Sequence, residues 1–486
     1  MADARDPLLP LRAAAAARNA AGLRRVLTPR AADPVPPGEL SGWPGLDSPG
    51  TPDSPSDLDS SGTLDCAGGP DFAGGPDFAG GLDFGGAPDS AGLPDIDGWP
   101  ADDVAAGSGR SAADGTVDLA SNDYLGLTRH PAVTAAAAAA AMRWGAGSTG
   151  SRLVTGTTEL HTRLERAVAG YCGAAGALVF SSGYLANLGV VTALAAALRP
   201  DPVATVKNPG VLVVSDAANH ASLIDGCRLA RARVEITPHL DVAAVEAALA
   251  RRSEPAALVL TESVFSVSGG LAPLADLHRV TRAHGALLVI DEAHALGVVG
   301  PGGRGAGFAA GLAGQPDVIR TVTLSKSLGA QGGAVLGDDS VIQTLVDTGR
   351  SFIFDTGLAP PCAGAALAAL RVLAGDPDRG RRCHQHARRI AGMAAGLGLA
   401  ASEPAAAVVS VTLGRPEAAT AARRICAEHG VRAGCFRPPS VPAGQSCLRL
   451  AAHATLTERD LDTVSRALVA VADHVRGRDP AGRRSP

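Results

Sequence analysis

The sequence predicts an α/β protein with a large, mostly parallel sheet domain, a smaller C-terminal α/β domain and an acidic insert near the N-terminus. Three observations predict this class. Short apolar runs alternate with Ala- and Leu-rich helical patterns across 114–360, as in parallel sheets that are covered on both faces. A shorter series of similar elements fills 361–475. A Gly-, Pro- and Asp-rich stretch at 31–113 lacks any such pattern. An N-terminal arm at 1–30 and a tail at 476–486 complete the chain.

Each strand of the large sheet is predicted from a run of four or five mostly apolar residues. The runs are 177–180, 211–214, 257–260, 286–290 and 321–324. Helical patterns separate or follow them at 184–198, 241–252, 274–284 and 457–474. Polar motifs come directly after the runs, namely SSGY, SDAANH, TESVFS, DEAH and SKS. Because ligands bind beyond the carboxyl ends of parallel strands, we expect a site where these motifs meet.

The acidic insert differs in charge from the rest of the chain. Residues 31–120 contain 17 acidic residues and one basic residue, Arg110, so the remainder carries +11 within a total of −5. The hexapeptide AGGPDF at 67–72 recurs at 73–78 and then decays. Gly and Pro at this density disfavour helices and strand ladders, so we predict a disordered spacer without a catalytic role. The alternative is an interaction or calcium-binding segment, although the nonapeptide calcium repeat is missing.

Several classes of protein are excluded by composition. The apolar runs are shorter than the roughly 18 residues of a membrane helix, and the N-terminus lacks a secretory signal pattern. The eight cysteines form no CxxC pair and no cluster with histidine, so we expect reduced thiols and no metal site. The basic body suits an anionic substrate or carrier, but no nucleic-acid-binding signature accompanies it. We therefore expect a cytoplasmic protein that binds neither nucleic acid nor membrane.

Lysine is rare in this chain, because only Lys207 and Lys326 occur among 43 basic residues. Arginine cannot be deprotonated in a protein and so cannot form a Schiff base, whereas lysine can. Lys207 lies in the turn-like TVKNPG, where a solvated lysine is expected. Lys326 lies in TLSKSLG directly after a buried run, which fits either an exposed loop lysine or a functional amine.

Asp291 strengthens the functional interpretation of Lys326. It ends the apolar run ALLVI and opens DEAHALG, and a carboxylate at a buried strand end is costly unless a cation pairs with it. The protonated nitrogen of a pyridine ring is one such cation, and pyridoxal phosphate contains it. A helix cap is the structural alternative. A magnesium site with Glu292 is another, but no GxxxxGK[ST] loop accompanies it.

These motifs resemble those of the α-oxoamine synthases, which are fold-type-I pyridoxal-phosphate enzymes of the class-II aminotransferase type. The resemblance covers about 114–475 and a short part of the arm. It rests on SNDYLGL, NHASLIDG, DEAHALGVVGPGGRG, TLSKSLGAQGGAV and RPPSVPAGQSCLRL. Members condense an amino acid with an acyl thioester and release CO2, and they use pyridoxal 5'-phosphate.

The resemblance implies a cofactor site. Lys326 corresponds to the Schiff-base lysine and catalytic base, Asp291 to the aspartate beneath the pyridine nitrogen, and His220 to the histidine stacked on the ring. These three are the predicted catalytic residues. The other predicted cofactor contacts are Ser266 and His294 at the 3-hydroxyl, Gly183, Tyr184 and Thr323 at the phosphate, and Thr356 from the other subunit. A contact from the other subunit implies a homodimer with a shared active site.

The resemblance also implies a substrate site. Arg449 corresponds to the arginine that binds the substrate carboxylate, and a planar guanidinium suits that bidentate task. The other predicted substrate contacts are Arg24, Asn122, His220 and Ser440. Arg24 is matched through few residues of the arm, and its neighbour Arg25 is an alternative. A solvated helix face would account for both arginines.

Among the branches of the family, RPPSVPAG and SRLVTGTTELH favour the one that condenses L-alanine with pimeloyl-CoA or a pimeloyl-acyl carrier protein in biotin biosynthesis. The main alternative is a sister synthase that uses glycine and another acyl-CoA. A second alternative is a non-catalytic partner subunit. The presence of Lys326, His220 and Asp291 argues against it, because such subunits lack the lysine.

Overall fold

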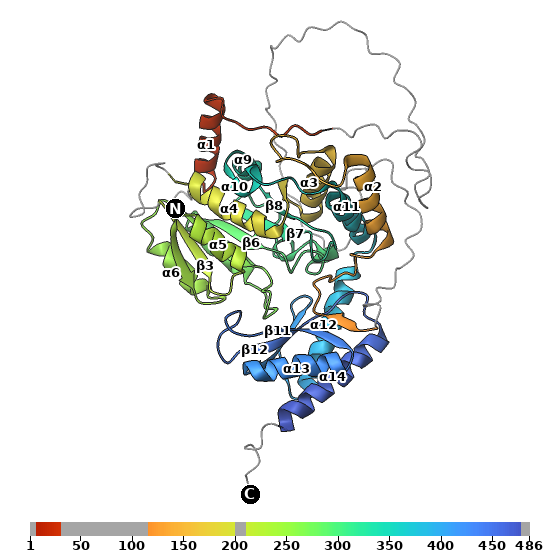
Figure 1. Cartoon of the computed structure of the whole chain (residues 1–486). Helices are drawn as coiled ribbons and strands as arrows, with labels where there is room; N and C mark the ends of the chain where they lie inside the picture. Colours follow the sequence, from red (N-terminus) through yellow and green to blue (C-terminus); the bar gives the residue numbers. More distant parts are fainter. Residues whose placement is uncertain (1–5, 31–114, 200–209, 478–486) are drawn as a thin grey trace, which may run out of the picture.

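The computed structural model describes residues 6–30, 115–199 and 210–477 (Figure 1). Lys207 and the predicted insert at 31–113 lie outside these residues. The described chain contains two sheets, and each has its own covering of helices. The α/β class predicted from the sequence is confirmed.

The larger sheet has seven strands in the order β2-β8-β7-β6-β5-β3-β4. Neighbours from β7 to β4 run parallel, whereas β8 is antiparallel to both β7 and β2. The strands are β2 (Gly176–Phe180), β3 (Val211–Asp216), β4 (Arg233–Thr237), β5 (Ala256–Glu262), β6 (Leu287–Asp291), β7 (Val318–Thr323) and β8 (Gly333–Gly337). All five predicted apolar runs fall on strands, with shifts of a few residues at their ends.

Two strands of the larger sheet were not predicted. Strand β4 lies at the sheet edge, and most of its side chains are at least partly exposed, so it lacks a continuous apolar run. Strand β8 is buried throughout but is short and bounded by glycines, which weakens the strand pattern. Both were missed because neither contains the run of four or five mostly apolar residues on which the other strands were predicted.

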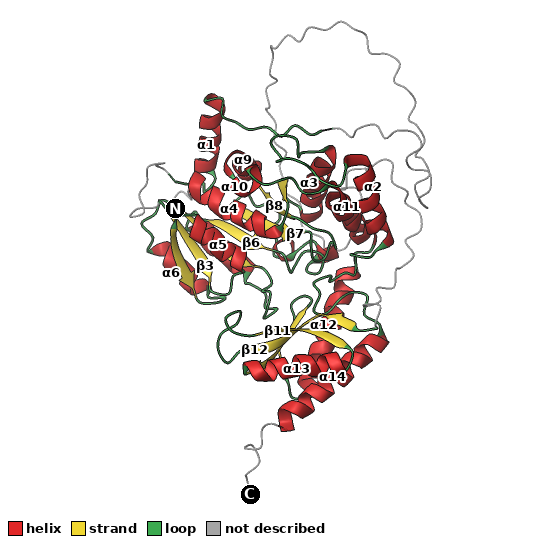
Figure 2. Cartoon of the chain, in the orientation of Figure 1, coloured by secondary structure: helices red, strands yellow, loops and turns green. Residues whose placement is uncertain are grey.

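Helices cover both faces of the larger sheet (Figure 2). One face packs against α1 (Leu9–Ala20), α4 (Gly183–Ala197), α5 (Ala221–Leu229), α9 (Asp339–Thr348) and α10 (Arg350–Ile353). The other face packs against α2 (Pro131–Trp144), α3 (Glu159–Cys172), α6 (Val242–Ala250), α7 (Leu274–Ala283), α8 (Ala306–Ala309) and α11 (Pro360–Gly375), and the short helix η2 (Pro301–Gly303) contacts α11. Alternate strand residues enter each layer, so the central strands are buried on both sides.

The smaller sheet has five strands in the order β1-β11-β12-β10-β9. They are β1 (Val117–Leu119), β9 (Ala400–Ala401), β10 (Val408–Gly414), β11 (Val431–Phe436) and β12 (Ser446–Ala451). Helices α12 (Arg379–Gly396), α13 (Pro416–Glu428) and α14 (Glu458–Gly477) pack against it in a separate apolar core. Strand β1 falls in the range predicted for the large domain, yet it pairs in parallel with β11.

The N-terminal arm packs on the large unit. Leu8 and Leu11 are buried in the core that α4 and α9 share. Near the end of α1, the Arg18 guanidinium donates to an Asp347 carboxylate oxygen at 3.0 Å, and beyond the helix the Arg25 backbone N–H donates to the other oxygen at 2.9 Å. The arm is thus anchored to α9.

The described residues contain neither a membrane-spanning helix nor a cluster of metal ligands. None of their helices is long and apolar enough to cross a bilayer. Nor do those residues bring three or more His, Cys, Asp or Glu side chains together as metal ligands.

Candidate active site

The polar motifs that follow the strands meet at one edge of the larger sheet. Thr323 ends β7 and precedes the Lys326 loop, Asp291 ends β6, and Glu262 ends β5. Strand β2 also ends at this edge, because it and β7 are both antiparallel to β8. The next residues begin α4, so a helix N-terminus points into the same region.

A hydrogen-bonded chain runs from Lys326 to Arg449. The Lys326 Nζ lies 3.0 Å from His294 Nε2, and His294 Nδ1 lies 2.6 Å from the Tyr124 hydroxyl. That hydroxyl donates to Asn122 Oδ1 at 3.1 Å and accepts from an Arg449 guanidinium nitrogen at 3.2 Å. One position of the His294 proton satisfies all of these hydrogen bonds. A neutral His294 carries its proton on Nδ1, donates it to the Tyr124 hydroxyl and accepts from Lys326 at Nε2.

The pKa values of this chain are shifted in directions that suit proton transfer. Burial lowers the pKa of His294 well below its usual value, and the nearby Lys326 and Arg449 lower it further. Burial also lowers the pKa of Lys326, although Asp291 and Glu262 oppose this shift. Burial raises the pKa of Tyr124 to about 12. A neutral histidine and a lysine that is more readily deprotonated than usual therefore lie in direct contact.

A second network links Asp291 to His220. One Asp291 oxygen accepts from the Asn187 amide at 2.7 Å and the other from the Ala293 backbone N–H at 2.8 Å. The same Asn187 amide donates to Ser222 Oγ at 2.9 Å, and Ser222 Oγ lies 2.8 Å from His220 Nδ1. His220 caps α5, and its side chain accepts the Ser222 backbone N–H. Asn187 is buried on α4, so a helix holds both the carboxylate and the histidine loop in place.

The N-terminus of α4 provides a site for an anion. Ser182 caps this 15-residue helix by accepting from the Leu185 backbone N–H, and the first helical residues are Gly183 and Tyr184. First-turn N–H groups lack partners inside a helix and carry the positive end of its dipole. Thr323 approaches Gly183 so closely that a Cβ there would lie 3.1 Å from the threonine Cβ. The Thr323 hydroxyl also contacts Ser325 Oγ at 2.7 Å.

Gly333 lets β8 approach this helix start. A Cβ on Gly333 would lie 2.5 Å from both the Cα and the nitrogen of Gly183. We expect Gly333→Ala to reduce the free energy of unfolding of the cofactor-free protein by about 1–3 kcal/mol, as overpacking does, and to weaken anion binding at α4. Denaturant unfolding and a phosphate titration would measure both effects.

Gly337→Ala is the matched control on the same strand. Its Cβ would meet Val341 at an ordinary 3.6 Å. Equal stability of the two variants would contradict the close-approach argument.

Ser266 connects the two units of the fold. Its carbonyl accepts from Arg449 Nε at 2.6 Å, and its N–H donates to a Glu262 oxygen at 3.1 Å. Arg449 lies on β12 and is buried. The arginine of the smaller sheet therefore reaches into the edge of the larger one.

The remaining predicted site residues make other contacts within this chain. Tyr184 is 43% exposed, and its hydroxyl donates to Asp225 at 2.7 Å. Arg24 donates to Gln343 of α9 at 3.1 Å. Thr356 and Ser440 are exposed. Thr356 forms an isolated bridge with Ser151. The roles in substrate or phosphate binding that the sequence predicts for these residues, Tyr184, Arg24, Thr356 and Ser440, stay predictions.

Sequence reasoning missed Tyr124 of SNDYLGL, Glu262 of TESVFS and Asn187 within the helical pattern at 184–198. Each is buried, and each contacts a predicted site residue. A polar residue on an otherwise apolar helix, as Asn187 is, was the signal that could have pointed to one of them.

Known proteins resemble this chain over most of its length. A family model described as aminotransferase class I and II matches residues 114–468. A protein of Mycobacterium sp. (strain KMS) named 8-amino-7-oxononanoate synthase is 58% identical over 365 residues, which cover 74% of this chain and 91% of that protein. The chain belongs to the 8-amino-7-oxononanoate synthase family. A second family member, from Mycolicibacterium vanbaalenii, is 56% identical over 73% of this chain and 89% of its own length.

Solved structures of related enzymes share the fold. The 8-amino-7-oxononanoate synthase of Francisella tularensis has a TM-score of 0.63 and 25% identity, covering 75% of this chain and 99% of that one. A serine palmitoyltransferase from S. paucimobilis, solved with pyridoxal phosphate (PLP) and myriocin, has a TM-score of 0.69 and 32% identity over 74% of this chain and 88% of that one. The fold-type-I architecture expected from the sequence is confirmed.

The residues of the candidate site fit PLP. The donors to Asp291 are neutral amides, so its negative charge is left for a cationic ring nitrogen. The N-terminus of α4, with Gly333 packed against Gly183, suits a phosphate. Lys326 follows β7 at the same edge of the sheet, and burial lowers its pKa toward the amine form.

Proposed function

We propose that this protein is a PLP-dependent enzyme that condenses L-alanine with a pimeloyl thioester to form 8-amino-7-oxononanoate, CO2 and the free thiol. The observation that carries the proposal is the contact between Lys326 and a neutral, buried His294, with Asp291 nearby. The family membership and its 58% identity to a named synthase support the same reaction.

Individual side chains account for the steps that the protein must perform. When bound, PLP would supply a ring that withdraws electrons from the α-carbon of the amino acid. Lys326 would hold it, Asp291 would keep its ring nitrogen protonated, and Gly183 and Thr323 would receive its phosphate. As a free amine, Lys326 removes the α-proton of alanine and later returns a proton to the product. His294 accepts a hydrogen bond from that amine and so orients it. Arg449 binds the alanine carboxylate, and Asn122 orients the substrate.

Substitution of Arg449 tests the substrate assignment. Arg449→Lys keeps the charge but removes the planar fork, so we expect KM for L-alanine to rise by about 10-fold or more, the scale of one charged hydrogen bond. Initial rates across alanine concentrations would measure it. Arg432→Lys, on the neighbouring strand β11 and exposed, is the control. An unchanged KM for alanine in Arg449→Lys would remove this residue from the substrate site.

The oligomeric state and the carrier also belong to the proposal. We expect a homodimer in which Thr356 of each subunit completes the other subunit's phosphate site and in which the arm around Arg24 contacts substrate. Asp355, the neighbour of Thr356, accepts a hydrogen bond from Ser181 of the same chain, just before α4, so the contribution of Thr356 to the other subunit rests on the family resemblance. Either coenzyme A or an acyl carrier protein could present the pimeloyl group, and we expect the reaction to occur in the cytoplasm.

The experiment that tests the function is a substrate comparison with the purified, PLP-loaded protein. We expect CO2 and thiol release with L-alanine plus pimeloyl-CoA or pimeloyl-acyl carrier protein, and much less with glycine plus acetyl- or succinyl-CoA. A preference for glycine and a short acyl-CoA would place the protein in a sister branch. No turnover and no PLP absorbance band would favour the partner-subunit alternative.

A further inference from the structure

Glu262 and Asp291 are neighbouring carboxylates in the floor of the candidate site. They end the adjacent parallel strands β5 and β6 and are paired in register, so both side chains lie on the same face of the sheet. Both are almost fully buried, with 2% and 6% of their surface exposed. Two ionised carboxylates that lie side by side in a buried site repel each other, which costs folding free energy, so we expect one of them to hold a proton.

The hydrogen bonds decide which carboxylate carries the proton. Asp291 accepts from two donors, one on each oxygen. Glu262 accepts from the Ser266 N–H through one oxygen, whereas its buried Oε1 has no hydrogen-bond partner among the described residues. Burial and, to a smaller extent, Asp291 raise the pKa of Glu262 to about 8, although Lys326 and the main-chain amides of Ser266 and His220 oppose the shift. Glu262 is therefore the carboxyl of the pair that holds the proton.

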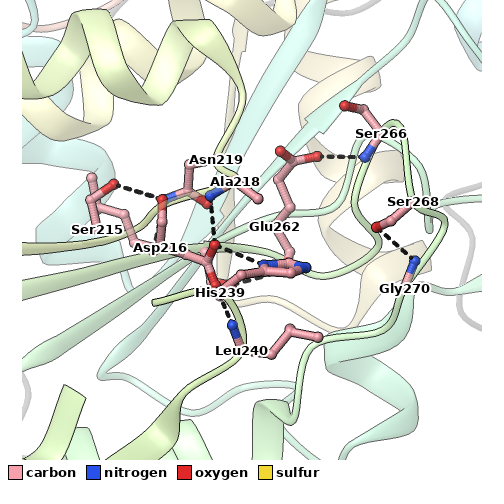
Figure 3. Close-up of polar contacts among 12 residues, drawn as sticks. Ser215, Asp216, Ala218, Asn219, His239, Leu240, Glu262, Ser266, Ser268 and Gly270 are labelled. Atoms are coloured by element: carbon pink, nitrogen blue, oxygen red, sulfur yellow. Dashed lines mark hydrogen bonds and ion pairs between the residues drawn. The ribbon is translucent and has the colours of Figure 1, made fainter. Parts of the chain in front are cut away.

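The Glu262 carboxyl holds the loop that follows β5. Figure 3 shows it pointing at the main chain of Ser266, whose carbonyl in turn receives the Arg449 guanidinium. Phe265 of the same loop packs edge-to-face on His239 at 4.3 Å, and His239 Nδ1 lies 2.9 Å from an Asp216 oxygen. Glu262 therefore helps to tie the Ser266 loop to the sheet floor, together with Ser263, whose N–H and hydroxyl both donate to the Asp291 carbonyl.

We propose that Glu262 is a positioning residue that works as a neutral carboxylic acid, holding the Ser266 loop and with it Arg449 in place without adding a second negative charge beside Asp291. The inference deepens the proposed function, on which its kinetic part rests. The charged groups that face Glu262 are Asp291 on β6 and Lys326 after β7, and Arg449 of β12 reaches it through Ser266.

The protonation state is tested on the cofactor-free protein. We expect an infrared band of protonated carboxylic acid at pH 7 that Glu262→Gln removes and Glu254→Gln retains. Glu254 is a matched control, because it is a buried glutamate that precedes the same strand and pairs with Arg233. A carboxylic acid band that is unchanged in Glu262→Gln would overturn the proposal.

The pH dependence of stability provides a second readout without cofactor. The folded-state pKa of Glu262 lies above its unfolded value, so wild type loses stability as pH rises from the unfolded pKa toward the folded one near 8. We expect the denaturation midpoint of Glu262→Gln to lack this decline and to exceed that of wild type at pH 9. Parallel pH profiles for the two proteins would count against a neutral Glu262.

Kinetics then separate positioning from mere structural support. Glu262→Gln preserves the acceptor for the Ser266 N–H, so we expect its kcat/KM at pH 7 to stay within about threefold of wild type, whereas Glu262→Ala should raise KM for alanine at least tenfold. Equal kinetics of the two variants would overturn the positioning role. The infrared and stability results could be as expected while the protein does not turn over alanine with a pimeloyl thioester. In that case the proposed function is wrong, but the conclusion that Glu262 is a neutral carboxylic acid remains.

Discussion

Lys326→Ala is expected to reduce kcat by at least 10²- to 10⁴-fold, the contribution that a positioned general base typically makes. The physical reason is that Lys326 is the amine in contact with His294 and the only lysine at the sheet edge among the described residues. Lys326→Arg should be equally inactive, because a guanidinium keeps the charge but cannot be deprotonated to act as a base. Steady-state kinetics with saturating alanine would measure both losses.

Lys207→Ala is the natural control for Lys326, since it removes the one other lysine of the sequence. It should retain wild-type kcat. Borohydride reduction of the PLP-loaded wild type followed by peptide mass spectrometry should place the label on the peptide that contains Lys326. Label on Lys207, or substantial turnover by Lys326→Ala, would refute the assignment.

Asp291→Asn should lower kcat by about 10²- to 10³-fold, the scale of losing one preorganised electrostatic contact. The substitution is nearly isosteric and leaves the Asn187 and Ala293 donors in place, but it removes the charge that would hold a ring proton. The absorbance spectrum of the PLP-loaded variant should also change, because the ring would lose its proton. Activity and spectrum together distinguish this effect from simple unfolding.

Asp317→Asn is a suitable comparison for Asp291. Asp317 is buried like Asp291, but it precedes β7 at the opposite edge of the sheet, where it pairs with His278. We expect a modest loss of stability and normal kcat from this variant. A similar fall in kcat for both variants would mean that Asp291 acts through stability alone.

The parts of the fold that could be predicted from sequence are those with a local physical signal. The buried parallel strands have continuous apolar runs, and Lys326 and Asp291 are recognisable because each follows such a run. Strand β8 lacks that signal, because it needs glycine to approach Gly183. Strand β1 is three residues long and is specified by its pairing with β11.

The site residues that escaped prediction depend on distant partners. Tyr124 meets His294 across 170 residues of sequence, and Asn187 meets Asp291 across 104. No local pattern reveals such a pairing. Glu262 is informative only once the register of β5 against β6 places it beside Asp291.

The position of β1 has a consequence for how the chain folds during synthesis. Val117 emerges from the ribosome long before its partner Val431, and the ion pair between Asp118 and Arg432 spans 314 residues. The smaller sheet therefore cannot be completed until nearly the whole polypeptide has been made, whereas the seven-stranded sheet can assemble first. Pairing of such high contact order is slow and leaves an apolar strand edge uncovered in the nascent chain. A chain that stops before β11 would retain the Lys326 loop but lack β12 and the carboxylate-binding arginine that it carries.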